Sequence, residues 1–314
     1  MNLHIPDVRI LEVHPPRSNL RHSCRLSSTL EERNHLGLPL LLHAVRDAAD
    51  LGYNFLHVAG ADPLSDPALP VLCREAHRHG MLTSTVTRSA ALAPQLEWLR
   101  CSIDLLGVEI QGRGAARNRL AAVRSSGIPF AIVFRLTSAS LPGLESAAEF
   151  AVAQGAALLQ VRPSGKLTSE QTVTAWMMVE FLRELQRGKL MIHLDAVNRY
   201  CLPTEPEDLA SWKRDVEREA RYLGEIVSPL VIEQDGAVTP LHHGFLRRFA
   251  FGNLREERLA AMAGRWIAAQ SGAFCEIYRT VLEKARASDR MFSDLYRMLA
   301  LEAGRGESGM PAAS

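Results

Sequence analysis

Titratable side chains recur at the ends of short apolar segments that follow one another along the chain. The residues whose types could support acid–base chemistry or bind an anion there are Glu12, His14, Glu109, Arg135, Arg162, His193 and Asp195. Several lie two residues apart, as Glu12 and His14 do, and residues at that spacing share one face of a β-strand. We therefore expect an inward-facing polar pocket large enough for a ligand. The alternative is that these faces point outward at a helix layer or meet solvent at the rim.

The apolar segments predict strands, and the amphipathic stretches between them predict helices. The predicted strands are 8–14, 55–59, 82–87, 105–111, 130–136, 157–162 and 189–195, and the predicted helices are 38–51, 66–79, 91–100, 115–125, 143–154 and 169–186. Such alternation is typical of a parallel sheet joined by right-handed crossovers. Seven strands in the first 195 residues favour a partial β/α barrel of the TIM type. Binding sites in these folds form at the carboxyl ends of the strands.

The pattern changes after residue 195, where prolines and acidic residues indicate a linker. A charged helix is predicted over 209–223, and Asp235-Gly236 predicts the turn of a β-hairpin because glycine adopts positive φ at low cost. Three further helices are predicted at 256–270, 273–287 and 289–302. We therefore expect a barrel over 1–200, a C-terminal extension of helix, hairpin and helices over 201–304, and a disordered tail over 305–314.

Composition and cysteine spacing exclude several classes of protein. The formal net charge of the 314 residues is +1, which gives no electrostatic case for nucleic acid or an anionic membrane surface. The chain has no apolar run of about 18 residues and no secretory signal pattern, so we expect a cytoplasmic location. The five cysteines are far apart and form no Cys-x-x-Cys pair, which argues against a disulfide framework or a structural zinc site.

The loop after the first predicted strand resembles the cluster-binding loop of radical S-adenosylmethionine enzymes. That family's loop reads Cys-Asn-Leu-Arg-Cys-x-x-Cys, and here Asn19, Leu20 and Arg21 occupy the matching central positions. The three cysteine positions are instead Ser18, His22 and Arg25. The resemblance therefore includes the loop but not its cluster ligands.

Further motifs extend the resemblance over roughly residues 7–260. Gly60-Ala61-Asp62-Pro63 looks like the family's Gly-Gly-Glu-Pro motif, which receives the amino group of S-adenosylmethionine, and Gln111-Gly112 lies where the fourth strand ends in Asp-Gly. Residues 80–89 are similar to the segment that ends in Thr-Asn-Gly. Segments 230–240 and 251–254 resemble the hairpin and the Gly-Asn-Leu element of peptide-modifying members. The resemblance thus implies a radical S-adenosylmethionine type partial barrel and a vestigial cofactor pocket formed by Gly60, Ala61, Asp62, Pro63, Gln111 and Gly112.

The substitutions in the loop bear on the chemistry that the resemblance implies. Radical generation needs three soft, anionic thiolates on three irons. Ser18 is a poor ligand, and the guanidinium of Arg25 stays protonated and cannot ligate iron. We therefore expect no metal and no resident cofactor. His22 and Cys24 as atypical cluster ligands, and S-adenosylmethionine bound without a cluster, stay open as alternatives.

Three functions are compatible with this sequence. The leading hypothesis is a degenerate member that acts as a binding or partner subunit in peptide or natural-product modification, together with an active radical S-adenosylmethionine homologue or a peptide substrate. The second is an enzyme whose barrel mouth supplies acid–base groups and an anion clamp without radical chemistry. The third is a residual radical enzyme that uses atypical cluster ligands.

Overall fold

Residues 8–15, 36–60, 63–88, 93–110, 113–199 and 223–305 are described in the computed structural model. The chain divides into two units. The first comprises Met1–Val86, Cys101–Asp104 and Ser211–Phe274, and the second comprises Thr87–Arg100, Leu105–Ala210 and Cys275–Ser314. Each unit is described by itself below.

Among its described residues, the first unit contains six strands that lie in the order β11-β10-β9-β1-β2-β3. Its elements are β1 (Ile10–Val13), α2 (Leu38–Asp50), β2 (Phe55–Val58), η2 (Pro63–Ser65), α3 (Leu69–Arg78), β3 (Leu82–Thr87), α9 (Leu223–Ile226), β9 (Leu230–Ile232), β10 (Ala237–Pro240), η5 (Arg247–Phe249), β11 (Gly252–Asn253) and the start of α10 (Leu259–Ala287). Strand β1 is parallel to both β2 and β9, whereas β10 is antiparallel to β9 and β11. The predicted hairpin is therefore present, and it joins the sheet through β9.

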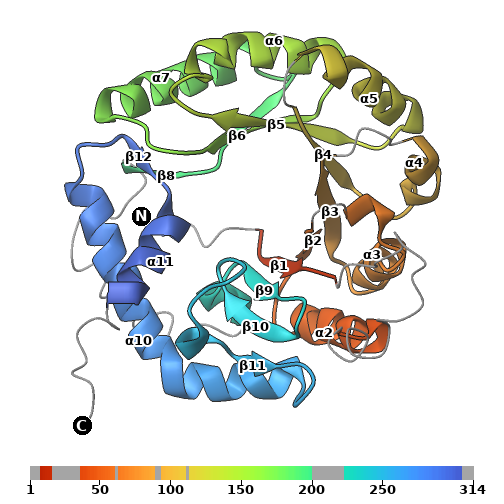
Figure 1. Cartoon of the computed structure of the whole chain (residues 1–314), viewed down its shortest axis with the longest axis vertical. Helices are drawn as coiled ribbons and strands as arrows, with labels where there is room; N and C mark the ends of the chain where they lie inside the picture. The colour runs from red at the N-terminus through yellow and green to blue at the C-terminus, as the bar shows by residue number, and fades with distance from the viewer. Residues whose placement is uncertain are drawn as a thin grey trace, which may run out of the picture. The chain divides into compact units, whose positions relative to one another are not determined.

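Helices α2 and α3 lie along one side of strands β1 to β3 (Figure 1). The strand residues with no exposed surface alternate with half-buried ones, as Leu11 and Val13 do in β1 and Leu56 and Val58 do in β2. Helix α2 buries Leu41, Ala44, Val45 and Ala48, which recur at the spacing of one helix face. Burial of one alternate set of strand residues places the other set, which includes Glu12, on the opposite face of the sheet.

The second unit contains the parallel strands β4, β5, β6 and β7 in that order. Its elements are α4 (Ala93–Leu99), β4 (Leu105–Glu109), α5 (Arg113–Ser126), β5 (Phe130–Leu136), η3 (Leu141–Gly143), α6 (Leu144–Gln154), β6 (Leu158–Pro163), α7 (Ser169–Leu185), β7 (Met191–Leu194), β8 (Val197–Asn198), β12 (Phe292–Ser293) and α11 (Leu295–Arg305), with the end of α10. Helices α5, α6 and α7 run along one side of the strands (Figure 1).

Strand β7 is paired on one side only among the described residues, with β6. Arg183 of α7 donates through Nε to the carbonyl oxygen of Ile192 at 2.9 Å. The backbone N–H of Ala196 donates to the carbonyl oxygen of Leu194, also at 2.9 Å. Ile192 and Leu194 alternate along β7 with the residues whose main-chain groups bond to β6. Both of these carbonyls therefore point away from β6.

The strand–helix alternation predicted for the first 195 residues is confirmed, with element ends shifted by a few residues. The prediction of separate helices at 256–270 and 273–287 is wrong, because α10 is one helix of 29 residues. Gly272 lies between the two predicted helices, yet the buried residues Trp266 and Phe274 stay in helical phase across it. Burial of that continuous face outweighs the roughly 1 kcal/mol that a glycine costs inside a helix.

Several other predictions concern parts of the chain that the structure leaves out. The predicted helix 209–223 and the tail 305–314 fall almost wholly outside the described residues. The boundaries 1–200 and 201–304 stay predictions. Within the described helices, none has a stretch apolar enough and long enough to span a bilayer.

Candidate functional site

The strand register of the second unit gathers polar side chains at one end of its sheet. Glu109 of β4 lies opposite Val133, which lies opposite Gln160, which lies opposite His193. Two residues further along these strands, Arg135 of β5 is the direct partner of Arg162 of β6. Residues in these positions share one face, because side chains two apart on a strand point the same way. The predicted candidates on these strands therefore come together at the carboxyl ends.

Glu109 is the buried anion of this group, with a side chain 4% exposed. Arg88 donates to Oε2 at 2.5 Å, and the Nε of Arg135 pairs with Oε1. Burial alone would raise the pKa of the Glu109 carboxyl, but the guanidinium groups of Arg88 and Arg135 outweigh it and lower that pKa below its usual value. Glu109 is therefore held as a carboxylate and is unsuited to act as a general acid near neutral pH.

Asp195 is a second carboxylate on the same face. Arg162 donates through Nε to Oδ2 of Asp195 at 3.0 Å, and Gln160 donates to the same oxygen at 3.4 Å. The backbone N–H of Asp195 bonds to the carbonyl of Val161 at 2.8 Å, which continues the β6–β7 pairing one residue past β7. His193 is exposed and lies in β7, two residues before Asp195. The predicted residues Glu109, Arg135, Arg162, His193 and Asp195 thus form one charged surface.

The first unit carries the other two predicted candidates. His14 lies directly after β1, and its Nε2 is 2.5 Å from Oε1 of Glu12. The ring of His14 also lies 4.6 Å from the ring of His243, centroid to centroid. A carboxylate this close fixes the orientation of the imidazole ring. Glu12 and His14 are therefore a pair, as their spacing suggested.

Sequence reasoning missed two neighbours of Glu12. His57 of β2 and Ser84 of β3 lie in register with Glu12, and Nδ1 of His57 is 2.8 Å from Oγ of Ser84. The alternation in Phe55–Val58 carried a signal for His57, because Leu56 and Val58 on either side of it are both buried. Ser84 could be found only from the strand register.

The polar side chains at the end of β3 do not face the site. Thr85 and Thr87 are both buried. Thr85 donates to the carbonyl oxygen of Val58 at 2.6 Å, and it shares its row with Val58 and Val13. That row belongs to the fully buried face, so the hydroxyl is satisfied internally and unavailable to a ligand.

Most residues of the predicted cofactor pocket and cluster loop lie outside the described residues. These are Ser18, His22, Cys24, Arg25, Ala61, Asp62, Gln111 and Gly112. Gly60 and Pro63 are described, and Gly60 has a φ of +155°, a backbone conformation that favours glycine. In the part of the chain that is described, no group of three or more His, Cys, Asp or Glu side chains could hold a metal ion.

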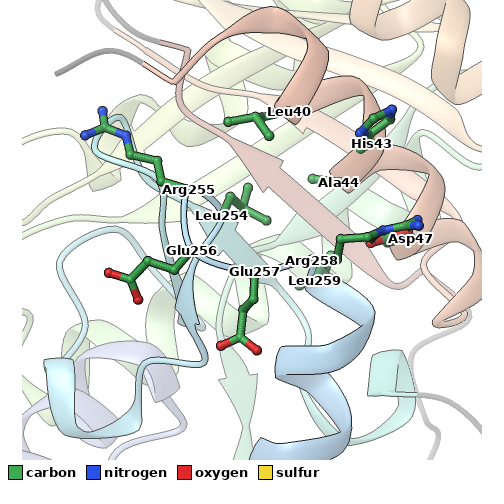
Figure 2. A pocket seen from close by; sticks show the side chains of 10 residues that line it. All are labelled: Leu40, His43, Ala44, Asp47, Leu254, Arg255, Glu256, Glu257, Arg258 and Leu259. Atoms are coloured by element: carbon green, nitrogen blue, oxygen red, sulfur yellow. Dashed lines mark hydrogen bonds and ion pairs between the residues drawn. The ribbon is translucent and has the colours of Figure 1, made fainter. Parts of the chain in front are cut away.

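A shallow cavity of about 190 Å³ lies between α2 and the start of α10 (Figure 2). Its lining residues are Leu40, His43, Ala44, Asp47, Leu254, Arg255, Glu256, Glu257, Arg258 and Leu259. Arg258 forms an ion pair with Asp47 across it. None of the predicted site residues lines this cavity, and its apolar lining consists of leucine and alanine side chains. We interpret it as a packing groove of the first unit.

Comparison with known proteins places this geometry in context. No family model matches the chain. The chain is similar to the PqqA peptide cyclase of Ruegeria pomeroyi, with 29% identity over 174 residues. The match covers 46% of this chain and 45% of that relative, so it spans less than half of the curated protein's length.

Solved structures with the same fold include two proteins that were crystallised with ligands. Streptococcus suis SuiB bound to S-adenosylmethionine has a TM-score of 0.57 at 13% identity, over 82% of this chain and 63% of SuiB. SuiB bound to its precursor peptide SuiA gives the same TM-score and identity, over 82% of this chain and 64% of SuiB. Native anSMEcpe with bound AdoMet and the peptide Kp18Cys has a TM-score of 0.55 at 14% identity, over 95% of this chain and 97% of that chain.

These findings confirm the resemblance to the radical S-adenosylmethionine superfamily that the sequence motifs indicated. The α/β fold with its parallel strands is shared with SuiB and anSMEcpe, and the relative found by sequence bears the name of a peptide cyclase.

Proposed function

We propose that this chain is a degenerate radical S-adenosylmethionine type protein that holds no cluster of its own and binds a peptide that is modified by an active partner. The fold and the similarity to a peptide cyclase support the peptide part of this proposal. The partner would be a homologue that keeps all three loop cysteines. The two proteins together would then perform a modification that this chain does not catalyse alone.

One observation carries the proposal, namely the donor set at the three cluster positions. Ser18, His22 and Arg25 offer a hydroxyl, an imidazole and a guanidinium where three thiolates are needed. A guanidinium does not lose its proton in proteins and has no lone pair to donate, so Arg25 also introduces a positive charge beside the iron position. This donor set does not fit a [4Fe–4S] cluster, and no step of the proposed function passes through one.

The direct test is to measure iron and acid-labile sulfide after anaerobic reconstitution. The full chain should retain neither, whereas a variant with Ser18→Cys, His22→Cys and Arg25→Cys should assemble a cluster on the same scaffold. A Cys24→Ser variant is the matched control, because it removes the one cysteine near the loop positions. Iron and sulfide retained by the unmodified chain, and lost in Cys24→Ser, would overturn the proposal in favour of a residual radical enzyme.

The partner is tested separately by co-purification of this chain with a homologue that has the complete cysteine triad. We expect a complex that forms at micromolar concentration and a modification of the peptide that requires both proteins. Full activity of the homologue alone would contradict a partner role for this chain.

The close pair of Glu12 and His14 favours a second candidate, a non-radical acid–base enzyme. The 2.5 Å contact and the neighbouring His243 ring provide a histidine that a carboxylate orients. If this chain catalyses a reaction alone, an unchanged rate of that reaction in a His14→Gln variant would eliminate this candidate. Loss of a reaction that this chain catalyses alone would support it.

A further inference from the structure

Two arginine side chains lie side by side at the carboxyl ends of β5 and β6. Arg135 and Arg162 are direct partners in the parallel register, and neighbouring strands lie only about 4.8 Å apart. Like charges placed directly opposite each other destabilise a sheet. The pair is therefore costly unless other charges compensate.

The ion pairs that offset this repulsion use only one nitrogen of each guanidinium group. Arg135 uses Nε to pair with Glu109, and Arg162 uses Nε to pair with Asp195. Among the described residues, neither arginine has a partner for its two Nη groups. The two side chains are 48% and 46% exposed, so these Nη groups remain accessible to a ligand.

The carboxylates also hold the two guanidinium groups in position. Glu109 is buried and receives Arg88 as well, which fixes the carboxylate that orients Arg135. Gln160 bonds to the same Asp195 oxygen that orients Arg162. Among the described residues of this cluster, three arginines thus pair with two carboxylates. Guanidinium groups that are oriented in advance lose less conformational entropy when they bind a planar anion.

We infer that Arg135 and Arg162 form a binding site for a carboxylate group, carried by an acidic side chain of the peptide that this chain binds. Two adjacent guanidinium groups match the planar, bidentate geometry of a carboxylate. A bound carboxylate would also relieve the repulsion between the two arginines. The inference rests on the proposed function for the identity of the ligand. The site itself rests only on the arrangement of Arg135, Arg162, Glu109 and Asp195.

The first test uses glutarate as a probe and neutral glutaramide as its matched control, with the full chain and ligand-observed NMR. Glutarate should bind and glutaramide should not, and added salt should weaken the binding of glutarate. Arg162→Gln should lower the affinity for glutarate about tenfold or more, because the site loses charged hydrogen bonds. Arg187→Gln is the control for the loss of one positive charge, since Arg187 is 82% exposed and lies after α7, and should leave binding unchanged.

Arg162→Lys separates geometry from charge and also provides a second variant should Arg162→Gln fail to fold. A lysine keeps the charge but lacks the planar fork, so glutarate affinity should still fall by several fold. The unfolding temperature of each variant is measured alongside. Glutarate that binds every variant as it binds the unmodified chain would overturn the site.

The second test identifies the source of the carboxylate. Two pools of random peptides, identical except for Glu or Gln at the central position, are captured by the immobilised full chain. Retention of the Glu pool over the Gln pool, lost in Arg162→Gln, supports an acidic peptide. Displacement of glutarate by S-adenosylmethionine, without preference between the pools, would overturn the peptide assignment.

The two proposals fail in different ways. Arginine-dependent glutarate binding, with neither peptide pool retained, would contradict the proposed peptide-binding function and still support the carboxylate site. Retention of both pools equally, with no glutarate binding, would contradict the carboxylate site and still support peptide binding.

Discussion

Glu233 accepts a hydrogen bond from Arg247 at 2.8 Å, across 14 residues of chain. Its other carboxylate oxygen accepts from the Thr239 hydroxyl at 3.0 Å and from the Gly244 backbone N–H at 2.9 Å. One side chain that is 4% exposed therefore ties the end of β9 to β10 and to the turn that follows.

Replacing this carboxylate should destabilise the hairpin. In Glu233→Gln the amide NH₂ would face a donor, since glutamine has only one accepting oxygen. We expect the free energy of unfolding to fall by about 1–3 kcal/mol, the range for a buried donor left without its acceptor. Urea denaturation measures it, with Glu149→Gln on the exposed face of α6 as the control that changes little. Equal effects of the two variants would contradict this role for Glu233.

The pH dependence of stability should carry a contribution from Glu109. Its folded-state pKa is lowered, so the stabilising ionised form is favoured above the unfolded pKa of about 4.3 and its contribution is lost as the pH falls through the folded value. Urea unfolding between pH 6 and pH 3 should therefore show a steeper loss in the unmodified chain than in Glu109→Gln. Parallel curves for the two proteins would show that the ion pairs with Arg88 and Arg135 do not contribute.

Cysteine reactivity should follow burial. Burial, with a smaller contribution from Asp104, raises the pKa of the Cys73 thiol to about 12 despite a hydrogen bond with Thr83, so little thiolate is present at neutral pH. Cys101 is exposed. Brief treatment of the native chain with iodoacetamide, followed by peptide mass spectrometry, should therefore modify Cys101 and spare Cys73. Equal labelling before denaturation would contradict the burial of α3 against β3.

The turn of the hairpin requires glycine for two separate reasons. Gly236 has a φ of +89°, and a Cβ there would lie 2.7 Å from Oδ1 of Asn253. Gly188 has a φ of +75° with no atom within 4 Å of such a Cβ. Gly188→Ala should therefore lower the free energy of unfolding by about 1–2 kcal/mol, from backbone strain alone. Gly236→Ala should lower the free energy of unfolding by more than Gly188→Ala does. Calorimetry that found the larger loss in Gly188→Ala would contradict this prediction.

The sequence was informative wherever a local pattern decides the structure. The strand alternation in Phe55–Val58 and the positive φ at Gly236 both follow from residue types over a few positions. The candidates on β4 to β7 could likewise be listed, because parallel strands present their carboxyl ends at one edge.

What the sequence did not predict depends on contacts between distant segments. Arg135 and Arg162 could be named, but their direct pairing requires the register of β5 against β6. In the sequence Glu233 is only an acidic residue after an apolar run. Its three hydrogen-bond partners come from the later part of the hairpin and the turn after it, so they could not be identified without the structure. Thr85 lies in register with Val58, a buried residue of another strand, and its side chain therefore faces the buried side of the sheet.

The side of β7 that is unpaired among the described residues would limit how the proposed peptide could be recognised there. The carbonyls of Ile192 and Leu194 point away from β6 and are already engaged by Arg183 and by the N–H of Ala196. An added strand would find half of the main-chain groups on this side occupied, so β-augmentation is disfavoured. Discrimination among peptides would then depend on their side chains, and edge-to-edge pairing between copies of this chain would be disfavoured for the same reason.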